Sequence, residues 1–190
     1  MSTTTPRTAE DATVVTAPTT LRPARHTWTH RLTSRMGAYG ITAALGAGTL
    51  AAFVPMCAPA PAPTTQQQVV DETNARRADN GLAPLTINAT LTAVAQAHAA
   101  DQASVDTMSH TGTDGTDAGT RITTSGYPTR AWGENVAGGY TTASSVMVAW
   151  MNSPGHRANI LNGTFTQIGI GLAYAADGTP YWSMELGRPW

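Results

Sequence analysis

An uncharged apolar stretch over residues 36–54 most constrains what this chain can fold into. Five arginines precede it in the sequence, and four of them lie within the preceding fourteen residues, namely Arg22, Arg25, Arg31 and Arg35. A positive flank followed by an apolar run of this length is typical of a secretory signal peptide or of an uncleaved signal anchor. Four glycines within the run weaken a helix in water, which argues against a buried core helix. The run therefore divides the chain into an N-terminal region and a part that folds outside the cytoplasm.

The segments on either side of the apolar run are not expected to fold. Residues 1–35 are polar and rich in threonine, and we expect them to be disordered because they have little apolar surface to bury. Residues 55–65 alternate proline and alanine, which predicts a stiff, extended linker. The folded domain is therefore predicted to span residues 66–190.

The only cysteine of the chain, Cys57, lies in this linker. The predicted domain thus has neither a disulfide nor a thiol nucleophile. Lipidation of Cys57 remains an alternative, although residues 54–56 lack the small residue that usually precedes a lipidated cysteine. Residues 58–62 resemble signal-peptidase sites but carry prolines, so the sequence does not decide between cleavage and anchoring.

The charge of the predicted domain excludes one class of partner. Residues 66–190 contain six arginines, no lysine and ten acidic residues. Binding to nucleic acid requires a basic surface that neutralises phosphates. We therefore expect no nucleic-acid partner.

The residue pattern from 66 onwards predicts helices first and strands last. A helix containing Val69 should end at Asn80-Gly81, and a second should begin after Asn88 as its N-cap. The second helix is predicted to bury Leu91, Val94, Ala95, His98 and Ala99, with Asp101 and Gln102 off that face. A short helix over 121–125, a strand over 132–136 and a helix from Thr142 follow. Alternating apolar residues over 165–174 and 181–186 predict a hairpin that turns at Asp177-Gly178. This order predicts an α+β domain layered around a small antiparallel sheet.

Three separated segments supply candidate functional side chains among turn residues. They carry His110, Glu134 and His156. Two imidazoles and a carboxylate can hold a divalent metal ion or shuttle a proton. Each also has a plain structural interpretation: His110 as a solvated loop residue, His156 as a residue bonded to backbone at a helix entry, and Glu134 as the partner of a protonated imidazole.

Several neighbouring polar residues are expected to have structural roles. Asn135 and Asn159 should fix loops through bonds to the backbone, and His98 should be packed or bridging. Asp114 and Asp117 lack a full calcium-binding pattern and should instead cap the next helix. Arg121 is expected to pair with an acidic residue near the site.

Residues 69–187 resemble the bacterial branch of the CAP superfamily, which is named after cysteine-rich secretory proteins, antigen five and pathogenesis-related proteins. The order and spacing of several motifs carry this resemblance. They are Asn74-Ala75-Arg76, Gly81-Leu82-Ala83-Pro84-Leu85, Ala95-Gln96-Ala97-His98-Ala99, Ser109-His110-Thr111-Gly112, Gly126-Tyr127, Gly133-Glu134-Asn135-Val136-Ala137, Trp150-Met151-Asn152-Ser153-Pro154-Gly155-His156-Arg157-Ala158-Asn159-Ile160-Leu161 and Ile168-Gly169-Ile170-Gly171.

The resemblance implies a three-layer α-β-α sandwich with a central groove lined by two histidines and two glutamates, where some members bind zinc or another divalent metal. By motif, the histidines are His110 and His156, which would be the metal ligands, and one glutamate is Glu134, the candidate catalytic residue. The second glutamate would follow Trp150 by three residues, and Ser153 stands there. The implied binding groove then comprises His110, Glu134, His156, Asn135 and Ser153.

These observations favour a secreted or membrane-tethered binding module whose groove takes a lipid, a peptide or a cell-wall component, with zinc or another divalent metal as the expected cofactor. One alternative is a metal-assisted peptidase or other hydrolase with Glu134 as the base. However, the chain has no H-E-x-x-H, no G-x-S-x-G and no cysteine in the domain. The other alternative is a structural envelope protein with a vestigial groove.

Overall fold

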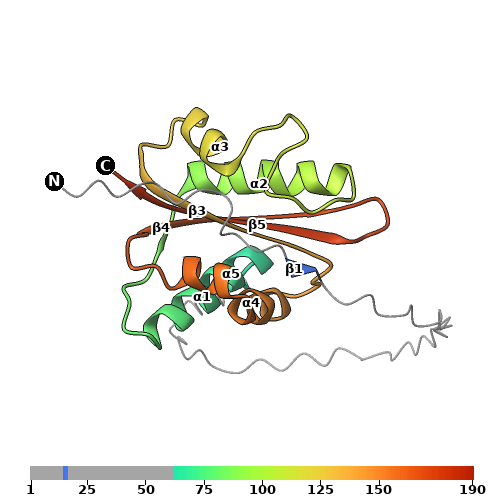
Figure 1. Ribbon diagram of the computed structural model, residues 1–190. Helices are drawn as coiled ribbons and strands as arrows, with labels where there is room; N and C mark the ends of the chain where they lie inside the picture. The colour runs from blue at the N-terminus through green and yellow to red at the C-terminus, as the bar shows by residue number, and fades with distance from the viewer. Residues whose placement is uncertain (1–14, 17–61) are drawn as a thin grey trace, which may run out of the picture. The chain divides into compact units, whose positions relative to one another are not determined.

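The computed structural model describes residues 15–16 and 62–190 (Figure 1). The apolar run, nearly all of residues 1–35 and most of the linker lie outside these residues. Disorder, signal, anchor, lipidation and domain boundaries therefore stay predictions. Within the described ranges, no helix is both long enough and apolar enough to cross a bilayer.

A five-stranded mixed sheet forms the middle of the described fold, in the order β1-β3-β5-β4-β2. Its strands are β1 (Val15–Thr16), β2 (Thr86–Ile87), β3 (Thr129–Gly138), β4 (Gln167–Tyr174) and β5 (Pro180–Pro189). The three long strands pair antiparallel, as the sequence predicts. The two-residue strands β1 and β2 add to the edges in parallel with β3 and β4.

Helices cover both faces of this sheet (Figure 1). They are α1 (Thr65–Ala78), α2 (Ala89–Ser104), α3 (Ala118–Thr124), α4 (Ala143–Asn152) and α5 (Pro154–Ile160). Helices α2 and α3 lie on one face, and α1, α4 and α5 lie on the other. The predicted α+β, three-layer architecture is confirmed.

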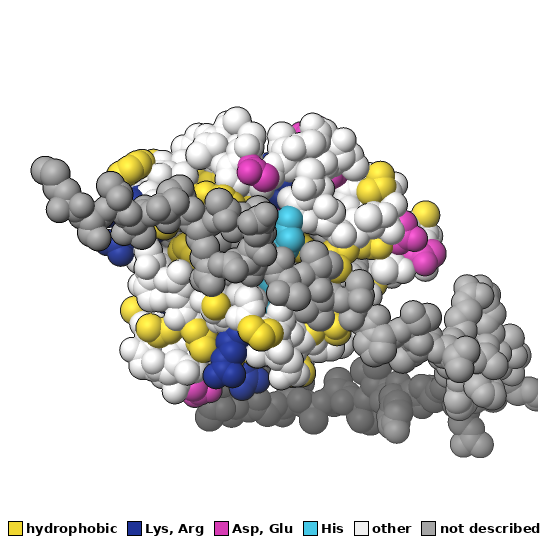
Figure 2. Space-filling model, viewed as in Figure 1, with side chains coloured by type: hydrophobic (Ala, Val, Ile, Leu, Met, Phe, Trp, Pro, Cys, Tyr) yellow, Lys and Arg dark blue, Asp and Glu magenta, His cyan; other side chains and the backbone are white. Residues whose placement is uncertain are grey.

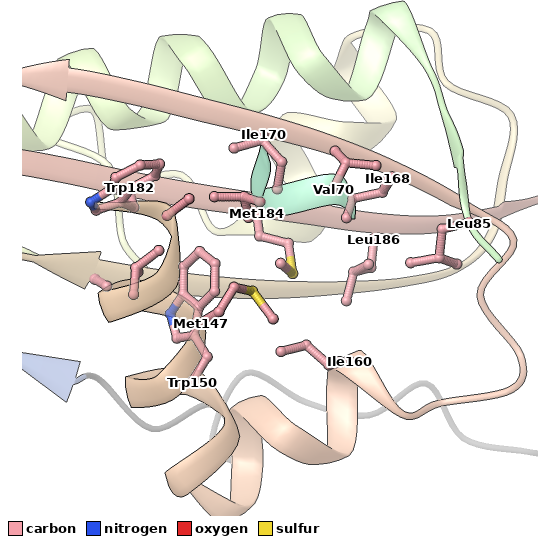
Figure 3. Close-up of a cluster of buried hydrophobic side chains, with 14 of the residues drawn as sticks. Val70, Leu85, Met147, Trp150, Ile160, Ile168, Ile170, Trp182, Met184 and Leu186 are labelled. Atoms are coloured by element: carbon pink, nitrogen blue, oxygen red, sulfur yellow. The ribbon is translucent and has the colours of Figure 1, made fainter. Parts of the chain in front are cut away.

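The larger hydrophobic core lies between the sheet and α1, α4 and α5. Side chains at alternate positions of a strand point to the same face, so β5 turns Trp182, Met184 and Leu186 towards this layer. They pack with Met147 and Trp150 of α4, both fully buried (Figure 3). Burying an aliphatic or aromatic side chain of this size contributes about 1.5–3 kcal/mol, so this core holds α4 and α5 firmly beneath the sheet.

The buried Arg77 of α1 fixes the position of α5. Its guanidinium donates hydrogen bonds to the backbone carbonyls of Ala83, Ile160, Asn162 and Phe165. Ile160 is the last residue of α5. Four fixed carbonyls therefore tie the C-terminal end of α5 to α1 and to the following loop.

On the other face, glycines let α2 lie directly on β4. A Cβ atom at Gly169 would lie 2.2 Å from the backbone of Leu91, and one at Gly171 would lie 2.1 Å from the carbonyl oxygen of Ala95. Such distances exclude any side chain at either position. The close approach brings the buried face of α2, including His98, down towards the sheet.

Local capping signals account for the helix starts. The side chains of Asn88, Asp117 and Thr142 each accept a hydrogen bond from a backbone N–H in the first turn of α2, α3 and α4. The caps at Asn88 and Asp117 confirm those predictions, whereas Asp114 does not cap α3, because its carboxylate accepts a hydrogen bond from the N–H of Thr116 in the preceding turn. Because Asp117 is the cap, α3 begins at Ala118, three residues before the predicted start.

One placement on α2 is wrong. Gln102 was expected off the buried face, but it is only 2% exposed. Its side-chain amide donates to the carbonyl of His98 and accepts from the backbone N–H of Ser109. The loop after α2 folds back over Gln102, which the helical period of α2 alone does not reveal.

Candidate functional site

The fold brings the three predicted site residues together beside β3. His110 comes from the loop between α2 and α3, Glu134 from β3 and His156 from α5. The ring centroids of His110 and His156 are 6.5 Å apart, and Nδ1 of His110 lies 2.7 Å from Oε1 of Glu134. The side chain of His110 is 16% exposed, and histidine atoms reach the surface between the two helical layers (Figure 2).

Glu134 is a buried carboxylate with both oxygens engaged. Oε1 faces Nδ1 of His110, and Oε2 accepts a hydrogen bond of 2.5 Å from Nη2 of Arg121. Burial alone would raise the pKa of Glu134, but the hydrogen bond with His110 and the charge of Arg121 outweigh it and hold the pKa below its ordinary value. Glu134 is therefore ionised at neutral pH.

Arg121 of α3 is the acid-pairing residue that the sequence predicts, and Glu134 is its partner. The guanidinium also donates to the carbonyls of Thr116 and His110. The Asp117 cap sets where α3 begins and thus where Arg121 lies. One side chain thereby connects α3, the histidine loop and β3.

The contact with Glu134 determines how His110 can act. An ionised carboxylate can only accept, so Nδ1 of His110 carries the hydrogen and donates it. Nε2, the other ring nitrogen, is buried and has no hydrogen-bond partner among the described residues. This nitrogen is therefore available to bind a ligand.

His156 is fully buried near the start of α5, and neither of its ring nitrogens has a partner in the described part of the chain. Burial, followed by the charge of the neighbouring His110 when that ring is protonated, lowers the pKa of His156 to about 4. The ring is therefore neutral at pH 7. Its nitrogens can bind a metal ion or a polar ligand.

The two predicted asparagines hold α5 against β3 and do so through the backbone, as expected. Asn135 donates to the carbonyl of His156, and Asn159 donates to the carbonyl of Glu134. Asn159 also donates to the side chain of Asn135. Ser153, at the junction of α4 and α5, is 5% exposed, and its hydroxyl has no partner among the described residues.

Sequence reasoning missed Glu185 as a site residue and placed His98 only as a packed or bridging residue. His98 is 1% exposed, bonds to the carbonyl of Ser109 through Nε2, and lies 3.6 Å from Oε2 of Glu134. Glu185 is fully buried on β5, directly opposite Glu134. The signal for Glu185 was present: in the alternation of Trp182, Met184 and Leu186, the intervening Glu185 must face the other layer.

The donor set fits a metal ion only in part. Among the described residues, no three His, Cys, Asp or Glu side chains are grouped to hold one. Glu134 is already committed to Arg121 and His110, which leaves the unpartnered nitrogens of His110 and His156. Two imidazoles suit zinc, with water or a bound ligand completing the coordination.

Comparison with known proteins identifies the family of the chain. Residues 70–186 match the CAP family, described as the cysteine-rich secretory protein family. The chain belongs to this family. A relative in Bacillus subtilis (strain 168), the uncharacterized protein YkwD, is 36% identical over 131 residues, which cover 69% of this chain and 50% of that protein.

Two solved structures of CAP relatives share the fold. One, from Bacillus anthracis, is an extracellular protein containing an SCP domain; it is 28% identical, with a TM-score of 0.59 over 65% of this chain and 40% of that one. The other is an outer surface protein from Borrelia burgdorferi, 25% identical, with a TM-score of 0.62 over 67% of this chain and 97% of that one. The chain thus spans half or less of the Bacillus relatives, so the activities of those whole proteins do not transfer to it.

Proposed function

We propose that this CAP domain is an exported binding domain whose two-histidine site takes an envelope component, a lipid or a peptide, together with a divalent metal ion such as zinc. The predicted signal or anchor over residues 36–54 and the extracellular and outer-surface relatives support a location outside the cytoplasmic membrane, either secreted or tethered. Tethering by the predicted linker would hold the domain off the membrane surface.

The observation that carries the proposal is the set of unpartnered polar atoms at the site. They include Nε2 of His110, both ring nitrogens of His156 and the hydroxyl of Ser153, which have no hydrogen-bond partner among the described residues. A buried polar atom left without a hydrogen bond costs about 1–3 kcal/mol. Such groups are uncommon in folded proteins unless a ligand, an ion or a water molecule satisfies them.

The contact between His110 and Glu134 supports a metal ion as part of the bound state. Histidines that bind metals usually donate their other ring N–H to a carboxylate, which fixes the ring and raises its basicity. His110 has this arrangement with Glu134 at 2.7 Å. Bound there, a metal ion would act as a Lewis acid that holds an oxygen of the ligand.

Burial of Glu134 supports binding rather than hydrolysis. A general base must come within hydrogen-bond reach of the proton that it removes. The side chain of Glu134 is 1% exposed, and Arg121 and His110 occupy its two oxygens. As packed here, Glu134 orients His110 and has no open oxygen to offer a substrate.

The test is metal analysis and ligand binding by the full-length chain, compared with the double variant His110→Ala/His156→Ala. We expect zinc to be bound by the wild type and lost from the double variant. A His30→Ala variant, which removes a histidine from the N-terminal region, controls for nonspecific binding by imidazoles. Vesicles and cell-wall extract should likewise bind the wild type more tightly than the double variant. Equal binding of zinc, of vesicles and of cell-wall extract by the two proteins would refute the proposal.

A further inference from the structure

Glu185 and Glu134 form a buried carboxyl pair that the proposed function does not explain. They occupy paired positions on β5 and β3, so their side chains point to the same face, towards α2 and α3. Glu185 is 0% exposed and Glu134 is 2% exposed. Two carboxylates that are neighbours and buried away from water repel each other strongly if both are ionised.

The surroundings hold positive charge for only one of them. Arg121 of α3 is the cation, and it already bonds to Glu134. His98 of α2 also faces the pair, but burial lowers its pKa, so the ring is neutral at pH 7. Beside Glu185, β4 contributes Gly169, which has no side chain, and β5 itself contributes the uncharged Ser183.

The hydrogen bonds show which carboxyl group carries the extra proton. Both oxygens of Glu134 accept hydrogen bonds, from His110 and Arg121. Oε1 of Glu185 accepts from the hydroxyl of Ser183, whereas no described N–H or hydroxyl group donates to Oε2. Residues directly opposite each other on antiparallel strands have Cβ atoms about 4.5–5.5 Å apart, and Glu185 and Glu134 hold such positions, so their carboxyl groups can meet. An oxygen that donates to a neighbouring carboxylate needs no other donor.

We propose that Glu185 is kept as a neutral carboxylic acid that donates a hydrogen bond to Glu134, and that it thereby positions Glu134 as the acceptor for Nδ1 of His110. Glu185 is then a positioning residue that acts on the site through Glu134. Its effect on ligand binding rests on the proposed function, whereas its protonation does not. Burial and the adjacent charge of Glu134 both raise the pKa of Glu185 well above its ordinary value, in agreement with this assignment.

The assignment has a definite consequence for stability. In the unfolded chain Glu185 releases its proton near its ordinary pKa of 4.5, whereas the folded protein retains it to a higher pH. The unfolded state therefore binds fewer protons across that window, so ionisation of Glu185 favours unfolding as the pH rises. A neutral residue at position 185 that still donates a hydrogen bond should remove this fall in stability with rising pH.

The first experiment compares Glu185→Gln with the wild type by urea denaturation of the full-length chain at about pH 4 and pH 8. We expect the midpoint of the variant, relative to the wild type, to move to higher urea as the pH rises. Glu72→Gln, at a partly buried position on α1, controls for the loss of one glutamate. A difference that is flat or falls with pH would overturn the assignment.

If the variant does not fold, the ¹³C shift of the Glu185 carboxyl in the wild-type protein tests the same assignment. The shift should remain at its protonated value at pH 7, and an ionised value there would overturn the assignment.

The second experiment tests positioning with Glu185→Gln and Glu185→Leu, which keep and remove the donor. Imidazole ¹⁵N spectra should show Nδ1–H of His110 in the wild type and in Glu185→Gln, and a changed pattern in Glu185→Leu. Zinc affinity should stay close to wild type with glutamine and fall roughly tenfold or more with leucine. Unchanged ¹⁵N spectra in the leucine variant would overturn the positioning role. If the wild type itself binds no zinc, the proposed function fails, while the urea and ¹⁵N results still decide the role of Glu185.

Discussion

At the scale of single residues, the buried charges of the site are paired. One ionised carboxylate, Glu134, is matched by one guanidinium, Arg121, and burial keeps His98 and His156 neutral by lowering their pKa. The carboxylate also decides the orientation of His110. Removing either member of the charged pair leaves a buried, unpaired charge. The free-energy cost of that unpaired charge is larger than the net stabilisation that the intact pair contributes.

Glu134→Gln should therefore destabilise the fold by about 3–5 kcal/mol, since Arg121 keeps its charge and loses its carboxylate. Urea denaturation at pH 7 measures the loss, with Glu72→Gln as the control for removing a glutamate. A loss below about 1 kcal/mol, the range of exposed ion pairs, would show that either solvent or an ionised Glu185 compensates the charge of Arg121 in the variant.

His156 should make stability depend on pH in the acid range. Its folded pKa of about 4 lies below the ordinary value of 6.5, so between these values the unfolded chain binds a proton that the folded chain does not. Stability should thus fall as the pH drops from about 6.5 to 4, by on the order of 3 kcal/mol for this residue. Denaturation with a chelator present measures it. His156→Gln should flatten this part of the curve, and an unchanged slope would contradict the assignment.

At the scale of elements, helix positions depend on local caps and on a few long-range contacts. The helix starts at Asn88, Asp117 and Thr142 can be predicted from the sequence, because an N-cap side chain bonds to the backbone of the first turn that follows it. The roles of Gln102 and Glu185 depend on long-range contacts and are not visible in the local sequence. Gln102 bonds to the loop that follows α2, and Glu185 meets Glu134 only through the pairing of β3 with β5. The sequence therefore predicts the layered fold and the meeting of His110, Glu134 and His156 better than it predicts the residues that support them.

The contact between α2 and β4 gives a prediction at this scale. Gly171→Ala would place a methyl group 2.1 Å from the carbonyl oxygen of Ala95, so α2 must move away from the sheet. We expect a loss of about 1–3 kcal/mol or more, together with a shift in the NMR signals of His98. Gly163→Ala is the matched control, because its Cβ would contact only a methyl carbon of Leu82, at 3.4 Å. Equal stability of the two variants would contradict the close packing of α2 on β4.

At the scale of the whole domain, the two-histidine site joins the layers. His110 follows α2 on one face of the sheet, while His156 belongs to α5 on the other. A ligand that binds both rings binds only the folded domain, since unfolding separates them. Such a ligand stabilises the fold by mass action, by about 2.7 kcal/mol at a hundredfold excess over Kd.

Zinc should accordingly raise the Tm of the wild type in a concentration-dependent way. The double variant His110→Ala/His156→Ala should show no such rise, because it lacks both unpartnered rings. Differential scanning calorimetry with and without chelator makes the comparison. An equal rise in both proteins would place zinc elsewhere on the chain.

The pairing of β3 with β5 also bears on how the chain avoids misfolded states. Glu185 alternates with Met184 and Leu186, which enter the tryptophan and methionine core. Sliding β5 by one position would invert its faces and push Glu185 into that core, far from Arg121. A sheet paired in that register would therefore bury an acid without a cation beside it, which disfavours it relative to the native register.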